Sequence, residues 1–138
     1  MKRVFADNFF WVARAVPSDQ WHEAARRAHA DLGRVHLVTP EEVLTEFLTS
    51  LSGRGSYWRQ RAVTTVILLR TDPALTIVSQ TPVSFQRGLE LYANRLDKEY
   101  SLVDCISMNA MHEEGITEIL TNDHHFTQEG FRVLVPRP

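Results

Sequence analysis

Cysteine is almost absent from this chain of 138 residues, and neither sign of charge dominates it. The single cysteine, Cys105, excludes an internal disulfide framework and fits a reducing compartment. The chain carries 15 lysine and arginine residues against 17 acidic residues, for a net charge of −2. This balance argues against a protein that coats nucleic acid through bulk positive charge, so any such binding needs a local basic surface.

Long hydrophobic runs are also missing. The most apolar uninterrupted run, residues 62–69, is far shorter than the ~20 residues that a membrane span needs. Near the N-terminus, Asp7 and Arg14 bracket only six uncharged residues. The apolar region of a signal peptide has ~7–15 residues. We therefore expect a soluble, cytoplasmic protein.

Three common catalytic motifs do not occur in the sequence. It contains neither the GxxxxGK[ST] loop that cradles phosphates nor a GxGxxG motif after the first expected strand. It also lacks the GxSxG elbow of serine hydrolases. The hydrophobic fraction of 43% is ordinary for a globular protein, and the length suits one domain.

Short apolar runs alternate with amphipathic segments along the chain. The pattern predicts strands over residues 2–6, 35–38, 75–78, 117–120 and 131–135. It predicts helices over about 18–32, 40–51, 57–70, 82–95 and 102–114, with loops after Asp7 and over residues 121–125. This alternation indicates βαβ units, so the expected fold class is α/β, with a mainly parallel sheet covered on both faces.

Three of these helices begin with recognisable signals. Thr39 is expected to cap the helix that starts at Pro40, with Glu42 completing a capping box. Thr81 followed by proline repeats the capping signal. Ser101 is expected to cap a helix that carries Asp104 in its first turn and ends at Gly115.

Acidic residues stand where ligands gather in open α/β sheets, at the carboxyl ends of strands. Asp7 follows the first strand, Asp104 begins a helix, and Asp123 follows the fourth strand. Each has a structural explanation taken alone, as a helix-dipole partner or a turn residue. Together, carboxylates at one edge would repel one another unless a cation such as Mg²⁺ lay between them. Such a site suits hydrolysis of a phosphodiester.

Four segments in this order resemble the PIN-domain nucleases, and among them the VapC-type ribonuclease toxins. They are FADNFFWVA with Asp7, VLTEF with Glu46, DKEYSLVDC with Asp104, and TNDHHF with Asp123. The resemblance spans essentially residues 1–138, as a single domain. It implies a three-layer α/β/α fold, Mg²⁺ or Mn²⁺, cleavage of single-stranded RNA, homodimerisation and inhibition by a cognate antitoxin.

The resemblance also assigns roles to individual residues. Asp7, Asp104 and Asp123 would hold the metal directly or through water, and Glu46 would position a metal-bound water or act as its base. Glu46 is selected by the resemblance alone, because helical periodicity would favour Glu41 or Glu42 equally. The family often has Thr or Ser after the first aspartate, whereas Asn8 stands here. We expect Asn8 to hydrogen-bond Asp7.

Several weaker signals have two interpretations. Residues 53–61 carry Arg54, Arg59 and Arg61 with two aromatic residues, which suits a path for single-stranded RNA. The alternative is a glycine loop before a helix whose Trp58 packs in the core or a dimer interface. Ser101 is either a helix cap or also a phosphate contact.

The histidines and the cysteine do not indicate further chemistry. Histidine spacing along the chain does not support a zinc site, although His124 or His125 can contact a phosphate. Cys105 is expected to be a buried apolar residue rather than a nucleophile.

Two other functions compete with the nuclease. The first is a catalytically inactive PIN-like module that binds RNA or a protein. It is suggested by Asn8, which departs from the family's usual Thr or Ser after the first aspartate. The second is a phosphotransfer domain with an acidic pocket after the first strand. That domain would need a second acid beside Asp7 and a late lysine, but the last lysine is Lys98.

Overall fold

A computed structural model describes residues 1–136, and residues 137–138, the end of the expected domain, lie outside the described part. Five parallel strands form one sheet in the order β3-β2-β1-β4-β5. The strands are β1 (Lys2–Ala6), β2 (Val35–Pro40), β3 (Leu75–Val78), β4 (Glu118–Leu120) and β5 (Arg132–Val133). The helices are α1 (Asn8–Ala15), α2 (His22–Asp31), α3 (Glu41–Leu51), α4 (Ser56–Thr71), α5 (Pro82–Ala93), α6 (Leu102–Glu114) and α7 (His124–Gln128). The expected α/β fold with a parallel sheet is therefore confirmed.

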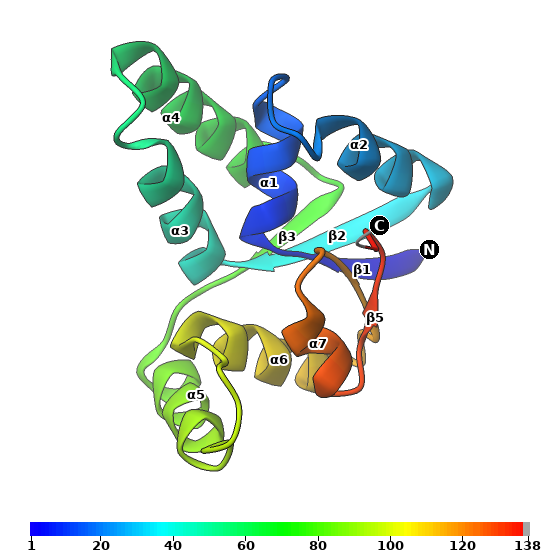
Figure 1. The fold of residues 1–138 in the computed structure, drawn as a ribbon, viewed down its shortest axis with the longest axis vertical. Coiled ribbons are helices and arrows are strands. Elements are labelled where there is room, and N and C mark those ends of the chain that lie inside the picture. The colour runs from blue at the N-terminus through cyan, green and yellow to red at the C-terminus, as the bar shows by residue number, and fades with distance from the viewer. Residues whose placement is uncertain (137–138) are drawn as a thin grey trace.

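Helices cover both faces of the sheet, which makes three layers (Figure 1). Successive strand residues point to opposite faces, so Val4 and Ala6 join a core with α1–α4, and Phe5 joins a core with α6 and α7. Helix α5 packs on α6 rather than on the sheet, through the buried Gly88. A Cβ atom at Gly88 would lie 2.5 Å from Ile106 Cγ1, so only glycine permits this approach.

The order of strands places a crevice between β1 and β4. From β1 the chain moves outward through β2 to β3, with α1–α4 on one face, and it then crosses back under the sheet through α5 and α6 to β4 (Figure 1). Helix α1 follows β1 and helix α7 follows β4, and these two helices consequently lie on opposite faces of the sheet. Ligands of open α/β sheets bind at such switch points, beyond the carboxyl ends of the strands.

Two helices were not expected from the sequence. Helix α1 follows Asp7 directly, where a loop was predicted; it is only eight residues long and buries Phe10, Trp11 and Ala13. The predicted loop is confirmed over residues 121–123, but helix α7 begins at His124, because Asp123 caps it by accepting a hydrogen bond from the His125 amide. The helix expected from residue 18 begins only at His22, and the last strand is only two residues long.

The predicted cap of α3 is also wrong. Thr39 is fully buried at the end of β2, where its hydroxyl donates to the Ala6 carbonyl at 2.7 Å and accepts from the Trp11 indole at 3.2 Å. Thr39 therefore links β1, β2 and α1, and Pro40 occupies the N-cap position of α3 with no side-chain cap. The caps expected at Thr81 and Ser101 are both confirmed.

Candidate active site

The four predicted acids lie around the crevice between β1 and β4. Asp7 follows β1, Asp123 follows β4, Asp104 lies in the first turn of α6, and Glu46 lies on α3. Their carboxylates are close enough to affect one another electrostatically, as the pKa values below show. The structure thus brings together residues that lie up to 116 positions apart in the sequence.

Asp7 is the most enclosed of the four, with only 9% of its surface exposed. Its pKa is raised to about 6, chiefly because burial disfavours the charged form, and Asp104 and Asp123 raise it further. The Asn8 backbone amide and the Thr121 hydroxyl act in the opposite direction. The Thr121 hydroxyl donates to Asp7 Oδ2 at 3.0 Å, so the carboxylate has a fixed orientation.

Glu46 faces the same charges from α3. Its pKa is raised to about 7, first by burial and then by Asp7 and Asp104. No signal in the periodicity of α3 pointed to this residue. Its electrostatic interaction with Asp7 and Asp104 depends on how α3 packs against α1 and α6.

Asp104 is held by the capping box that the sequence predicted. Its amide donates to Ser101 Oγ at 3.0 Å, and its Oδ2 accepts from the Ser101 amide at 3.1 Å. Burial raises the pKa of Asp104, the Ser101 amide lowers it, and Asp123 raises it again. Ser101 therefore acts as a cap that orients an acid of the site, and its role as a phosphate contact stays a prediction.

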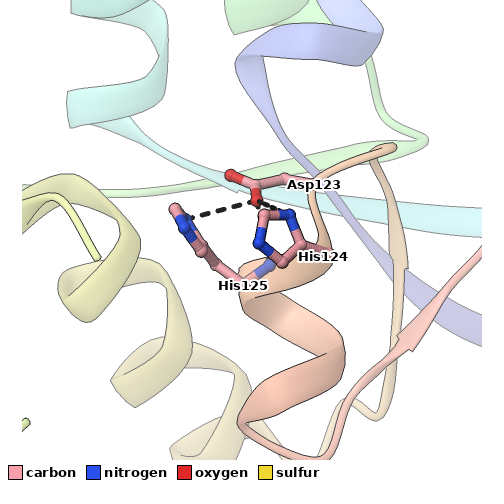
Figure 2. A group of neighbouring side chains, drawn as sticks. All are labelled: Asp123, His124 and His125. Atoms are coloured by element: carbon pink, nitrogen blue, oxygen red, sulfur yellow. Dashed lines mark hydrogen bonds and ion pairs between the residues drawn. The ribbon is translucent and has the colours of Figure 1, made fainter. Parts of the chain in front are cut away.

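A histidine that the sequence did not mark as a site residue, His125, lies between Asp123 and Asp104, and Figure 2 shows its contact with Asp123. His125 Nδ1 lies 3.3 Å from Asp123 Oδ1 and 3.4 Å from Asp104 Oδ2. His124 is more exposed, and its Nδ1 is 3.8 Å from Asp123 Oδ1. Thr121, also missed, accepts from the Asp123 amide at 3.2 Å while it donates to Asp7. Both residues belong to the segment TNDHH, whose polar composition was the only signal.

Tyr100, Glu129 and Arg95 form a further set of contacts that supports the His125 ring. The ring of Tyr100 meets the ring of His125 edge to face, with centroids 5.5 Å apart. The Tyr100 hydroxyl donates to Glu129 at 3.2 Å, and Arg95 donates to both oxygens of Glu129 at 2.8 and 3.1 Å. These contacts tie the start of α6 to α7 and so fix Asp104 relative to Asp123.

The expected contact between Asn8 and Asp7 does not form through the side chain. Asn8 Nδ2 donates instead to Ser50 Oγ on α3, at 3.0 Å. The backbone direction at the start of α1 sends this side chain toward α3, whereas Thr121 takes the position beside Asp7. Asn8 thereby joins α1 to the helix that carries Glu46.

The three arginines are not brought to the acids. Arg54 lies in the loop between α3 and α4, at the outer end of that pair of helices (Figure 1), and Arg59 and Arg61 lie in the first turns of α4. All three are exposed, and Arg59 donates to the Ser52 carbonyl at 3.1 Å. Trp58 packs against the core, as the alternative interpretation of this segment expected.

Cys105, His22 and His29 are each buried or in contact with other residues of the fold. Cys105 is fully buried, which raises the pKa of its thiol to about 11 and confirms that it is not a nucleophile. His22 Nδ1 donates to the Ala13 carbonyl at 2.7 Å, and His29 packs on the Phe10 ring. No helix within residues 1–136 is long and apolar enough to cross a membrane.

The donor set fits a hard divalent cation. Asp7, Asp104 and Asp123 offer carboxylate oxygens, the ligands that Mg²⁺ and Mn²⁺ prefer. Burial raises the pKa of Asp7 and Asp104, and neighbouring carboxylates raise both further, so a cation at this position would offset unfavourable charge. Asp123, His124 and His125 also place one possible ligand atom each within 4.8 Å of one another. His125 Nδ1 is buried and has no hydrogen-bond partner of good geometry among the described residues.

Comparisons with known proteins agree with this arrangement. The model of the PIN domain family matches residues 9–131, which include three of the four acids. A crystal structure of Mycobacterium tuberculosis VapC20, described as a Sarcin-Ricin loop cleaving toxin, is 26% identical, with a TM-score of 0.83 over 93% of this chain and 95% of that one. FitAcB from Neisseria gonorrhoeae shares the fold at 15% identity, with a TM-score of 0.63 over 95% and 96% of the two chains. No curated protein sequence matches.

Proposed function

This chain belongs to the PIN domain family and is VapC-like, and from that premise we propose that it is a metal-dependent endoribonuclease, the toxin of a toxin–antitoxin pair. The observation that carries the proposal is the group of four acids at the switch point of the sheet, where burial and neighbouring carboxylates raise the pKa of Asp7, Glu46 and Asp104. Such an arrangement destabilises the protein unless a cation compensates it, so its occurrence here favours a catalytic role.

The proposed ligands of Mg²⁺ or Mn²⁺ are Asp7, Asp104 and Asp123. When bound, the ion would stabilise the charge of the phosphodiester and lower the pKa of water. Thr121 holds Asp7, Ser101 holds Asp104, and His125 lies between Asp104 and Asp123, so each ligand has a fixed direction. Fixed donors need no reorganisation during the reaction.

Glu46 is the proposed base. A group with a pKa near the working pH is best suited to accept a proton from attacking water. The pKa of Glu46, raised to about 7, meets that condition. Asn8 supports α3 beside it through Ser50. Neither Glu46 nor any other residue of the described chain is proposed to form a covalent bond with the substrate.

Single-stranded RNA is the proposed substrate, and an antitoxin and a second copy of the chain are the proposed partners. The likeness to a toxin that cleaves the Sarcin-Ricin loop supports the substrate class. Apolar side chains on exposed helix faces support protein partners. They lie on α4 (Tyr57, Val63, Ile67 and Leu68) and on α5 (Val83, Phe85, Leu89 and Tyr92).

Cleavage of a labelled pool of single-stranded RNA tests the function. Wild type and Asp104→Asn are compared with Mg²⁺, Mn²⁺ and EDTA, since asparagine retains an oxygen for the Ser101 amide but removes the charge. Asp97→Asn is the matched control, because its exposed carboxylate pairs with Lys98 just before the same helix. We expect cutting by wild type and by Asp97→Asn, and none by Asp104→Asn or in EDTA. RNA binding without metal-dependent cutting would instead favour the inactive binding module.

A further inference from the structure

A cleft of about 460 Å³ opens beside the acids, between α3 on one side and α5 and α6 on the other. We refer to it as the α3–α5 cleft. Among the residues that line it are Glu42, Glu46, Thr49, Gln80, Phe85 and Ile106. Glu46 belongs to both the cleft and the acidic site. The residues next to Asp7 and Asp104 in the chain, Asn8 and Val103, also line it.

The charges of the cleft exclude a phosphate group. No lysine, arginine or histidine from the described chain lines it, while two glutamates do. The histidines near the acids, His124 and His125, belong to α7, and neither of them lines the cleft. An RNA backbone is therefore repelled from the cleft, and the part of a nucleotide that can enter it is the uncharged base.

The walls of the cleft match the two kinds of surface that a base presents. One wall is apolar: Phe85 has 45% of its surface exposed, and Ile106 and neighbouring α6 side chains lie behind it. Two polar side chains also line the cleft, namely Gln80 and Thr49, and the Thr49 hydroxyl, which donates to the Thr45 carbonyl at 2.9 Å, can still accept a hydrogen bond. Unpaired RNA bases stack on aromatic rings and form hydrogen bonds along their edges.

The lining of the cleft includes a carboxyl oxygen that lacks a hydrogen-bond donor within the described chain, on Glu42. Glu42 is only 8% exposed, and its Oε2 has no hydrogen-bond partner among residues 1–136. Buried polar atoms without partners are costly and rare in proteins. An amino group on a base edge supplies the missing donor.

We propose that the α3–α5 cleft binds one unpaired nucleobase of the substrate RNA, next to the phosphodiester that is cleaved, with the base stacked on Phe85. The proposal rests on the proposed function for its substrate class and adds to it the position that reads the RNA. Shared walls with the acidic site make the bound nucleotide a neighbour of the scissile bond.

Binding and cleavage are measured separately to test it. RNA oligonucleotides with a single 2-aminopurine at successive positions are titrated with protein in EDTA, where base stacking changes the fluorescence. Corresponding RNAs with a single abasic site compete for binding in EDTA and are also cleaved in Mg²⁺. The variants are Phe85→Ala, Phe85→Trp, which retains an aromatic face, and Leu89→Ala, a control on the same helix with 44% exposure that does not line the cleft.

We expect a fluorescence change at one position with wild type, Phe85→Trp and Leu89→Ala, and none with Phe85→Ala. Loss of one base stack corresponds to an RNA affinity about 5- to 150-fold weaker. An abasic site at that same position should weaken wild-type RNA binding by a similar factor and Phe85→Ala hardly at all. Stacking in EDTA without cleavage in Mg²⁺ would support the base site and refute the nuclease.

Two results would overturn the base site. The first is equal sensitivity of wild type and Phe85→Ala to every abasic position. The second is an equal loss of RNA binding by Phe85→Ala and Leu89→Ala together with a fall in molecular mass by light scattering. That second result would identify the α5 face as a contact between protein chains.

Discussion

The acidic site should make the metal-free protein less stable as the pH rises, and Asp7→Asn should remove part of that loss. Asp7 is almost fully buried, and its pKa of about 6 in the folded chain exceeds the ordinary value of 3.8. The folded state therefore retains a proton that the unfolded chain releases. Stability from this proton is fully present below pH 3.8 and is lost as the pH rises through 6.

The size of the effect follows from the two pKa values. A difference of one pH unit corresponds to 1.36 kcal/mol, so a difference of about two units corresponds to about 3 kcal/mol above pH 7. At pH 4.5 only about 1 kcal/mol has been lost. Asparagine is neutral throughout and can still accept the hydrogen bond of Thr121. Asp7→Asn should therefore exceed wild type in free energy of unfolding by an amount that grows with pH.

Urea unfolding in EDTA at pH 4.5, 6 and 8 measures this difference. Asp97→Asn, an exposed acid, should follow wild type at each pH. Adding Mg²⁺ should stabilise wild type, by about 2.7 kcal/mol at one hundred times the dissociation constant, and should stabilise Asp7→Asn much less. If Asp7→Asn were less stable than wild type by the same amount at pH 4.5 and pH 8, the argument that burial strains this carboxylate would be wrong.

Three further changes test the surroundings of the site. Ser101→Ala should cost about 0.5–2 kcal/mol in urea unfolding because the α6 cap is lost, and Ser101→Thr should restore most of it. Glu129→Gln should destabilise the protein at pH 7, with a difference from wild type that shrinks as the pH falls through the range where Glu129 is protonated. The reason is that Arg95 lowers the pKa of Glu129, so its stabilising contribution exists only above that range. Gly88→Ala should cost about 1–3 kcal/mol in thermal unfolding, because its Cβ would overlap Ile106 Cγ1, and Ile106→Ala, which removes that atom, should add less to the loss in Gly88→Ala than it costs in wild type.

The elements that the sequence predicted well are those with local signals. The five strands are short apolar runs between polar ones, and α5 and α6 have a capping residue followed by a helical period. Helix α1 has only eight residues, all apolar except Asn8 and Arg14, and no side-chain cap at its start, so it lacked the local signal that marks α5 and α6. Thr39 had the right type and position for a cap, but a buried hydrogen bond to the Ala6 carbonyl outweighed it.

The candidate site divides in the same way. Asp7, Asp104 and Asp123 stand at strand ends or helix starts, so topology alone brings them near one edge. Glu46 has no such marker, because its place beside Asp7 and Asp104 depends on the packing of α3. Thr121 and His125 contact acids through tertiary geometry, and no spacing in the sequence reports the direction of those side chains.

The location of the site explains how the fold accommodates the repulsion between its acids. Asp7 and Asp123 follow neighbouring strands at the middle of the sheet, and both large cores lie directly behind them. The two cores pack on β1 and β4, and parallel hydrogen bonding at Phe5 and Ala6 fixes the register of these strands. Repulsion between the acids therefore cannot be relieved by moving the backbone. The repulsion remains, and it adds to burial, the larger cause, in raising the pKa of Asp7 and of Glu46. A cation that binds there gains the free energy that the empty site lacks, which makes the rigid sheet the source of the metal affinity that the proposed nuclease requires.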